Sequence, residues 1–150
     1  FVQDVIKDKL KAEVLFHGVN IKPGMHLLIA LKDNKIIIAL PGFAYSSTVC
    51  AILYVLPLIY KFRNSNEKLP IVKARINEDF RRFQAKTIFT ACNVEYINNE
   101  YQINFDGKKS GTSAILTNML ESPALLIQKE DSQDIKSGDL VDILLLNNIK

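Results

Sequence analysis

The sequence predicts two folded parts: the closing segment of a layered α/β domain, followed by a small domain made mostly of β-strands. The first 60 residues change periodicity in the order helix, strand, hairpin, helix, which is typical of a layered α/β domain. Residues 63–70, RNSNEKLP, are polar and turn-forming. After them, nearly every apolar segment is a short strand candidate. We therefore expect an α/β part over residues 1–62, a linker over 63–70 and a β-barrel domain over 71–150.

The first part begins with a short amphipathic helix over residues 2–11, where apolar residues recur at helical spacing. Three strands are expected after it, at residues 12–21, 25–31 and 35–40. A Pro23–Gly24 corner ends the first of these strands. Lys32-Asp33-Asn34 is a short polar loop suited to a hairpin between the other two.

A second proline–glycine corner, Pro41–Gly42, ends the hairpin and precedes a long apolar segment. Ser46, Ser47 and Thr48 are expected to cap a helix there, and Ser46 and Ser47 are interpreted as cap residues. Residues 49–60 carry no charge on any face, which predicts a helix buried nearly all round. This apolar stretch is shorter than the roughly 20 residues needed to cross a bilayer, so no membrane partner is expected.

Five strand candidates follow the linker, at residues 71–80, 86–97, 101–106, 124–130 and 139–146. Asn98–Asn99 separates two of them and predicts a tight hairpin, because asparagine tolerates positive φ. One short helix is expected at residues 113–121, ending before a Ser-Pro pair. Five strands and one helix in this length predict a small barrel or sandwich.

Composition limits the function classes. The 150 residues are 48% hydrophobic and 23% charged, as in an ordinary globular protein. Their net charge of +3 is spread evenly, without the dense basic stripe that binds nucleic acid. Because the chain begins at Phe1 without a start methionine or a targeting signal, we expect it to be a piece of a longer polypeptide.

The two cysteines, Cys50 and Cys92, are isolated and have no histidine at metal-ligand spacing. They predict buried, reduced thiols and a cytoplasmic location rather than a zinc site. His17 and His26 alternate with apolar residues, so each is interpreted as a polar residue on a sheet face or edge.

Several segments in order resemble the molybdopterin molybdenumtransferase family, which comprises the MoeA proteins and the E domain of gephyrin. They are FHGVNIKPGMH, then LPGFAYSS after a hairpin, a long apolar helix with a late proline, GTSAILTNML, and IKSGDLVDILLL at the end. The corresponding family signatures are K-P-G-K-P, L-P-G-N-P, a Gly-Ser segment opening a short helix, and a final glycine-containing strand. Each motif is short, but their order and spacing make the resemblance specific.

The resemblance implies a fold and an activity. The first part would be the tail of a molybdopterin-binding-like domain, and the second part the C-terminal β-barrel domain. Family members are cytosolic, elongated homodimers that place molybdate into adenylylated molybdopterin and release AMP. The carboxylates that hold magnesium and molybdate would come from segments before Phe1, so residues 1–150 alone are expected to be inactive.

The first corner is the main candidate binding site. A ligand carrying phosphate and dithiolene groups is strongly anionic, and a turn with a fixed ammonium suits such charge. Lys22 would supply that ammonium, while Pro23 and Gly24 would hold the backbone close to the ligand. The alternative is a solvated lysine before an ordinary turn.

The second corner and one serine are further candidates. Pro41 and Gly42 would let the backbone approach the ligand, and the alternative for them is a plain strand-to-helix turn. Ser113 matches the family's Gly-Ser position approximately, and an ordinary helix cap explains it equally well.

The chain departs from the family signatures at several positions. Family members carry lysine where this chain has Met25, proline where it has His26, and Asn-Pro where it has Phe43–Ala44. A family arginine aligns with Ala85. Arg81, Arg82 and Lys86 lie close enough in the sequence for an alignment shift, or a substitution from a neighbouring position, to restore that charge.

These losses leave other functions open. Each lost charge-assisted hydrogen bond would cost about 1.5–3 kcal/mol. One alternative is a degenerate, non-catalytic paralogue that binds pterin or acts as a scaffold. Another is a sensor of a different anion, with Phe43 stacked on an aromatic ring. Core packing is the preferred interpretation of Phe43.

Overall fold

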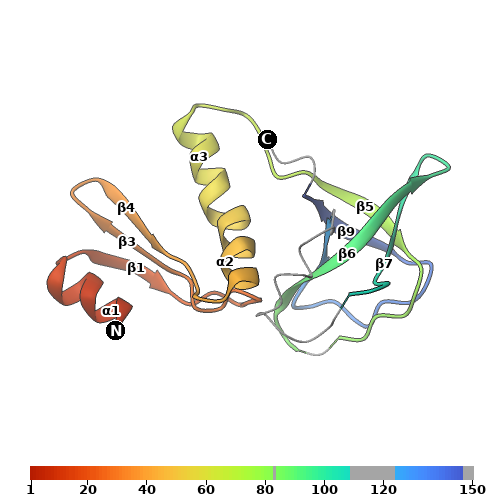
Figure 1. Ribbon diagram of the computed structural model, residues 1–150, viewed down its shortest axis with the longest axis horizontal. Helices are drawn as coiled ribbons and strands as arrows, with labels where there is room; N and C mark the ends of the chain where they lie inside the picture. Colours follow the sequence, from red (N-terminus) through yellow and green to blue (C-terminus); the bar gives the residue numbers. More distant parts are fainter. Residues whose placement is uncertain (83, 109–123, 147–150) are drawn as a thin grey trace.

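The computed structural model describes residues 1–82, 84–108 and 124–146, which form two lobes (Figure 1). A small sheet and a long helix make up the first lobe, and a β-barrel makes up the second. The described elements, in chain order, are α1 (Val2–Asp4), η1 (Val5–Lys9), β1 (Glu13–His17), β2 (Ile21–Lys22), β3 (Leu28–Lys32), β4 (Lys35–Ala39), α2 (Ala44–Cys50), η2 (Ala51–Val55), α3 (Leu56–Phe62), β5 (Ile71–Ile76), β6 (Thr87–Ile97), β7 (Glu100–Asn104), β8 (Ala124–Gln128) and β9 (Leu140–Leu145). The helix expected at 113–121 lies outside the described residues.

The first sheet is antiparallel, in the order β1-β3-β4. Its hairpin turns at Asp33 and Asn34, whose φ angles of 47° and 60° suit a tight primed turn. The hairpin expected at this loop is therefore confirmed. The N-terminal helix is confirmed over residues 2–9, where α1 runs directly into the π-type turn of η1. Ile6 from this helix is buried against the sheet together with Ala30.

The single strand expected over residues 12–21 is wrong. The segment forms two strands, β1 and β2, which belong to different sheets. Gly18 separates them with a φ of 93°, a conformation that a β-branched residue would not adopt. β2 pairs in parallel with β6, where Ile21 is in register with Thr87. The first lobe thereby contributes a strand to the barrel sheet.

The second lobe is a closed barrel of five strands. The sheet runs in the order β2-β6-β7-β5-β9-β8, and an additional pairing of β6 with β8 closes the ring. β6 is long enough to serve both neighbours, because Ile88–Cys92 pair with β8 and Asn93–Ile97 pair with β7. The barrel prediction is confirmed. So is the hairpin at Asn98–Asn99, whose φ angles are 52° and 66°.

One continuous helix, α2-η2-α3, runs over Ala44–Phe62 between the lobes (Figure 1). The predicted serine and threonine caps are wrong, because the helix begins at Ala44, after Phe43, without a side-chain cap. The hydroxyls of Ser47 and Thr48 instead donate to the Ala44 carbonyl inside the helix, at 3.0 and 2.9 Å.

The helix is less buried than expected. Its first turns pack on the barrel, but residues 51–58 are half-buried and Phe62 is 69% exposed. Ala44–Phe62 has 19 residues, so by length and apolar composition alone it is long enough to cross a membrane. Such a single helix is weak evidence for a span, since core helices of globular proteins share these properties.

An apolar core joins the two lobes. It combines Tyr45 and Val49 of the helix with Phe89 of β6 and Leu125 of β8. The buried Tyr45 hydroxyl donates to the Phe89 carbonyl at 2.9 Å and accepts the Ala91 amide N–H at 3.0 Å. The Tyr45 hydroxyl thus bonds to the β6 backbone just beyond Ile88, the last residue of β6 that pairs with the two-residue strand β2.

Candidate functional site

The Pro23–Gly24 corner is buried against the helix. Gly24 has a φ of +119°, and a Cβ there would lie 2.6 Å from Cys50 Sγ. The Cys50 thiol donates to the Gly24 carbonyl at 3.5 Å. Close packing on the helix therefore requires glycine at position 24, independently of any ligand.

Burial raises the pKa of the Cys50 thiol to about 11 and that of the Cys92 thiol to about 12. Both cysteines are free and buried, as expected from the sequence. Because the neutral thiol is a poor nucleophile, these residues serve packing rather than covalent chemistry.

Lys22 lies where β2 meets the barrel. It is half-buried and in register with Ile88, which in turn pairs with Gln128 of β8. Alternation along the strands puts Ile88 and Gln128 on the same face as the barrel-core residues Cys92 and Leu126. Lys22, Ile88 and Gln128 thus form a row across three neighbouring strands at one end of the barrel. The Lys22 ammonium forms no ion pair with any residue that the structure describes.

Gln128, in the same row, is 1% exposed. Its amide nitrogen donates to the Gln133 carbonyl at 3.4 Å. Its Oε1 has no hydrogen-bond partner within the described part of the chain.

Lys86 brings a second cation to this junction. It precedes β6, and its ammonium lies 3.0 Å from the sulfur of Met25, just past the first corner. The backbone nearby is tied, because the Thr87 amide donates to the Asn20 carbonyl at 3.1 Å. The contact puts Lys86 beside Met25, the position where the family signature that this chain resembles has lysine.

The second corner lines a hollow of about 330 Å³ in the first lobe. Pro41 and Gly42 meet His17 and His26 there, and the remaining lining residues are Phe1, Val2, Gln3, Asp4, Leu28, Ala39 and Leu40. A Cβ on Gly42 would meet no atom within 4 Å. Packing therefore does not require glycine at position 42, in contrast to position 24.

The structure brings together only some of the predicted site residues. Pro41 and Gly42 share the hollow, whereas Lys22, Pro23 and Gly24 do not line it. His26 connects the two regions, because it lines the hollow and lies only two residues after Gly24. Ser113 is outside the described residues. Nothing in the sequence pattern indicated that His17 and His26 share one hollow, because β1 and the 23–27 turn are brought together by the β1–β3 pairing.

Phe43 corrects one expectation. Its side chain is 61% exposed, so its interpretation as core packing is wrong. Tyr45, two residues later, fills the core instead. Phe43 is extended and precedes the first helical residue, Ala44, whereas Tyr45 lies within the helix.

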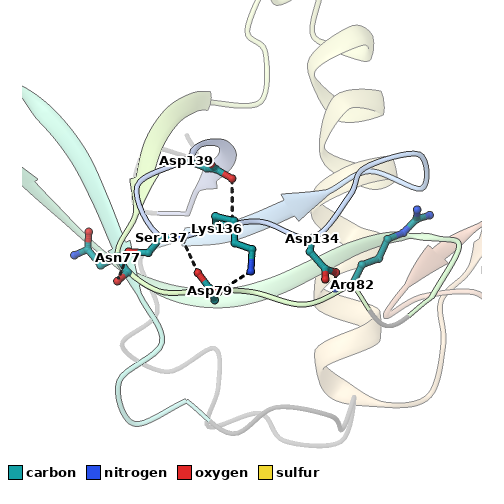
Figure 2. A network of polar contacts seen from close by, with 7 residues as sticks. All are labelled: Asn77, Asp79, Arg82, Asp134, Lys136, Ser137 and Asp139. Atoms are coloured by element: carbon teal, nitrogen blue, oxygen red, sulfur yellow. Dashed lines mark hydrogen bonds and ion pairs between the residues drawn. The ribbon is translucent and has the colours of Figure 1, made fainter.

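Two barrel loops are joined by a polar network (Figure 2). Asp79 accepts the Ser137 amide N–H at 3.0 Å and the Lys136 ammonium at 2.9 Å. The Ser137 N–H and then the Lys136 ammonium lower the pKa of the Asp79 carboxyl. Asp139 accepts the Lys136 amide N–H at 2.8 Å, and Asp134 accepts that of Arg82 at 2.8 Å.

Contacts near the same network determine which neighbouring cationic side chains are available to bind a ligand. The Arg82 guanidinium donates to the Ser132 and Gln84 carbonyls, at 2.8 and 3.1 Å. The Arg82 guanidinium therefore helps to hold the two barrel loops together. Of Arg81, Arg82 and Lys86, Lys86 is the one that, within the described part of the chain, contacts Met25 next to the first corner.

Metal coordination finds no support in the described ranges. They contain no group of three or more histidine, cysteine, aspartate or glutamate side chains placed to hold a metal ion. The ammonium groups of Lys22 and Lys86 suit charge-assisted hydrogen bonds to an anion.

Comparison with known proteins confirms the resemblance that the motifs indicate. No protein-family model matches the chain. A molybdopterin molybdenumtransferase of Staphylococcus aureus is 27% identical over 144 residues, which are 91% of this chain and 32% of that protein. The chain thus spans about a third of the length of this curated relative.

Solved structures give the same result for the fold. A molybdopterin biosynthesis moeA protein from Pyrococcus horikoshii aligns with a TM-score of 0.72 and 25% identity, covering 95% of this chain and 39% of that one. A molybdenum cofactor biosynthesis protein from Pyrococcus furiosus aligns with a TM-score of 0.68 and 20% identity, covering 95% and 54%.

Proposed function

We propose that this chain, which resembles the molybdopterin molybdenumtransferases over nearly its whole length, forms part of the ligand cleft of an enzyme that inserts molybdate into adenylylated molybdopterin. The observation that carries the proposal is the similarity in sequence and fold over 91% and 95% of the chain. Both proline–glycine corners fall within this range of similarity in the order that the family signatures have.

The first corner would bind the anionic part of the ligand. Lys22 is half-buried and without an ion-pair partner in the described part, so its ammonium has donors available. Phosphate oxygens accept such charge-assisted hydrogen bonds more strongly than neutral acceptors do. Pro23 and Gly24 would act by fixing the backbone that carries Lys22.

The second corner would border the ligand on the other side. Pro41 and Gly42 already line an open hollow, and the absent side chain at Gly42 leaves room for close approach. His26 extends the 22–26 turn into that hollow, which is how the two corners would serve one ligand. Ser113 is proposed as a further contact.

Molybdate is the substrate in this proposal, and magnesium is assigned to residues other than those described. The described residues hold no metal cluster, so we assign ligand binding to this chain and not magnesium coordination. The proposal also includes a cytosolic homodimer. The apolar side chains of Ile59 and Phe62, 42% and 69% exposed, are one surface that would suit it.

Activity of the full-length protein tests the proposal. Adenylylated molybdopterin and molybdate are supplied, and AMP release and active cofactor are measured. We expect both products above a protein-free blank. No product at saturating molybdate and magnesium would reject the enzymatic function.

Substitution of Lys22 tests the assigned site. Lys22→Ala should weaken binding of adenylylated molybdopterin about tenfold or more, because a charge-assisted hydrogen bond contributes about 1.5–3 kcal/mol. Stability should change by less than about 0.5 kcal/mol, since the ammonium forms no ion pair with a described residue. Isothermal titration gives the affinity, and urea denaturation gives the stability. Unchanged affinity would remove Lys22 from the site.

A degenerate, non-catalytic paralogue is the second candidate. It is favoured by the uncharged Met25 and by the exposed Phe43, which stand where the family carries lysine and asparagine. Met25→Lys combined with Phe43→Asn and Ala44→Pro separates the two candidates. A large gain in pterin affinity supports degeneration, whereas a native protein that already binds tightly supports a retuned site.

A further inference from the structure

We infer that Lys86 is a ligand-binding residue, which supplies from the barrel the cation that is missing at position 25. The inference rests on the proposed function, in that the site at the first corner binds an anion. It goes further by assigning a residue from the other lobe to that site. Adenylylation of a phosphate makes a phosphoanhydride, and this is the chemical class of anion that we assign to Lys22 and Lys86.

The contact with Met25 fixes where the ammonium lies. Lys86 Nζ is 3.0 Å from Met25 Sδ, and both side chains border the turn that follows Lys22. A thioether is a weak, neutral acceptor, so it satisfies little of a lysine that carries three donors. The remaining donors are available to an anion at this turn.

The strand pairing puts both lysines near the same end of β6. Lys22 is in register with Ile88, and Lys86 lies two residues before Ile88. Lys86 directly precedes the first residue of β6, so it lies next to the end of β6 that pairs with β2. The Thr87–Asn20 backbone bond holds this register up to the residue after Lys86.

Charges nearby leave the two lysines unneutralised. Neither forms an ion pair with a described residue. Glu130 reaches the same edge, but its carboxylate accepts a hydrogen bond from the Asn20 amide rather than from either lysine. Lys22 and Lys86 thus give a local excess of positive charge at the lobe junction, which an anion would offset.

The inference is tested by binding measurements on the full-length protein with two probes, adenylylated molybdopterin and inorganic pyrophosphate. Lys86→Ala should weaken both about tenfold or more, and Lys86→Arg should retain most of the affinity. Lys35→Ala is the matched control, since it removes the same charge from the tip of the β3–β4 hairpin, away from the barrel (Figure 1). It should bind both probes as the native protein does.

A rescue separates shared binding from a general charge effect. Met25→Lys in the Lys86→Ala background should restore affinity, and in the native background it should add much less. Equal gains in both backgrounds, or native affinity in Lys86→Ala, would overturn the inference while leaving the proposed function intact. Lys86-dependent binding of pyrophosphate without binding of the pterin would overturn the proposed function and leave the anion site. Binding of neither probe would reject both.

Discussion

At the scale of single residues, the two glycines of the corner motifs have different physical roles. Gly24 has a left-handed φ and lies where a Cβ would meet Cys50, whereas Gly42 has open space around it. The sequence shows two similar Pro-Gly pairs and cannot separate these roles. The difference arises from a contact between residues 26 positions apart.

This difference gives a paired prediction. Gly24→Ala should destabilise the fold by about 1–3 kcal/mol, because it combines an unfavourable φ with a clash against buried Cys50. Gly42→Ala should change stability by less than about 0.5 kcal/mol. Urea denaturation followed by circular dichroism measures both. Equal effects of the two substitutions would contradict the packing role assigned to Gly24.

Residue-level reasoning from the sequence identified the cysteines as buried thiols and left Lys86 as one of three possible cations. The sequence does not separate Lys86 from Arg81 and Arg82, because Arg82 is held by the carbonyl of Ser132, 50 residues further along the chain. The core position predicted for Phe43 is wrong for a related reason. The apolar character of a residue does not by itself tell whether its side chain faces the core or the solvent.

At the scale of elements, turns with strong local chemistry were predicted correctly, whereas the short strand β2, which is defined by its tertiary pairing, was not. Asp33–Asn34 and Asn98–Asn99 adopt the positive φ angles that their side chains tolerate. β2 has two residues, too few for any periodicity, and its parallel partner lies more than 60 residues away. The helix start was displaced because Ser47 and Thr48 bond back into the helix.

The loop network gives a pH prediction at this scale. The folded-state pKa of Asp79 is lowered, so its stabilising effect is complete above the unfolded value near 4 and is lost as pH falls through the folded value. The native protein should therefore be more stable than Asp79→Asn at pH 6, and the difference should shrink below pH 4. Urea midpoints between pH 2 and pH 6 measure it.

Asp8→Asn serves as the control for that series, since it neutralises an exposed carboxylate of the N-terminal helix. A difference between native protein and Asp79→Asn that grows on acidification would contradict the assigned contacts to Ser137 and Lys136.

At the scale of the whole molecule, the order of motifs predicted the barrel and the family resemblance, but the sequence did not indicate how the lobes are joined. They share a strand, β2, and a core around Tyr45. The tyrosine occupies a helix position that reads as ordinary core packing. Its hydroxyl bonds become visible only once β6 is placed beside the helix.

The junction predicts an effect of Tyr45→Phe. The substitution keeps the ring but leaves the Phe89 carbonyl and the Ala91 amide unpaired in a buried site, which should destabilise the protein by about 1–3 kcal/mol. Tyr96→Phe, which removes an exposed hydroxyl bonded to Asn99, should cost less than about 0.5 kcal/mol. Equally small losses of unfolding free energy in Tyr45→Phe and Tyr96→Phe would mean that the Tyr45 hydroxyl does not stabilise the junction between the lobes.

The most direct test of the central claim is a crystal structure of the full-length protein with adenylylated molybdopterin. We expect phosphate oxygens about 3 Å from the ammonium groups of Lys22 and Lys86, and the ligand bordering Pro41 and Gly42. A ligand bound elsewhere, with both ammonium groups in solvent, would contradict the account.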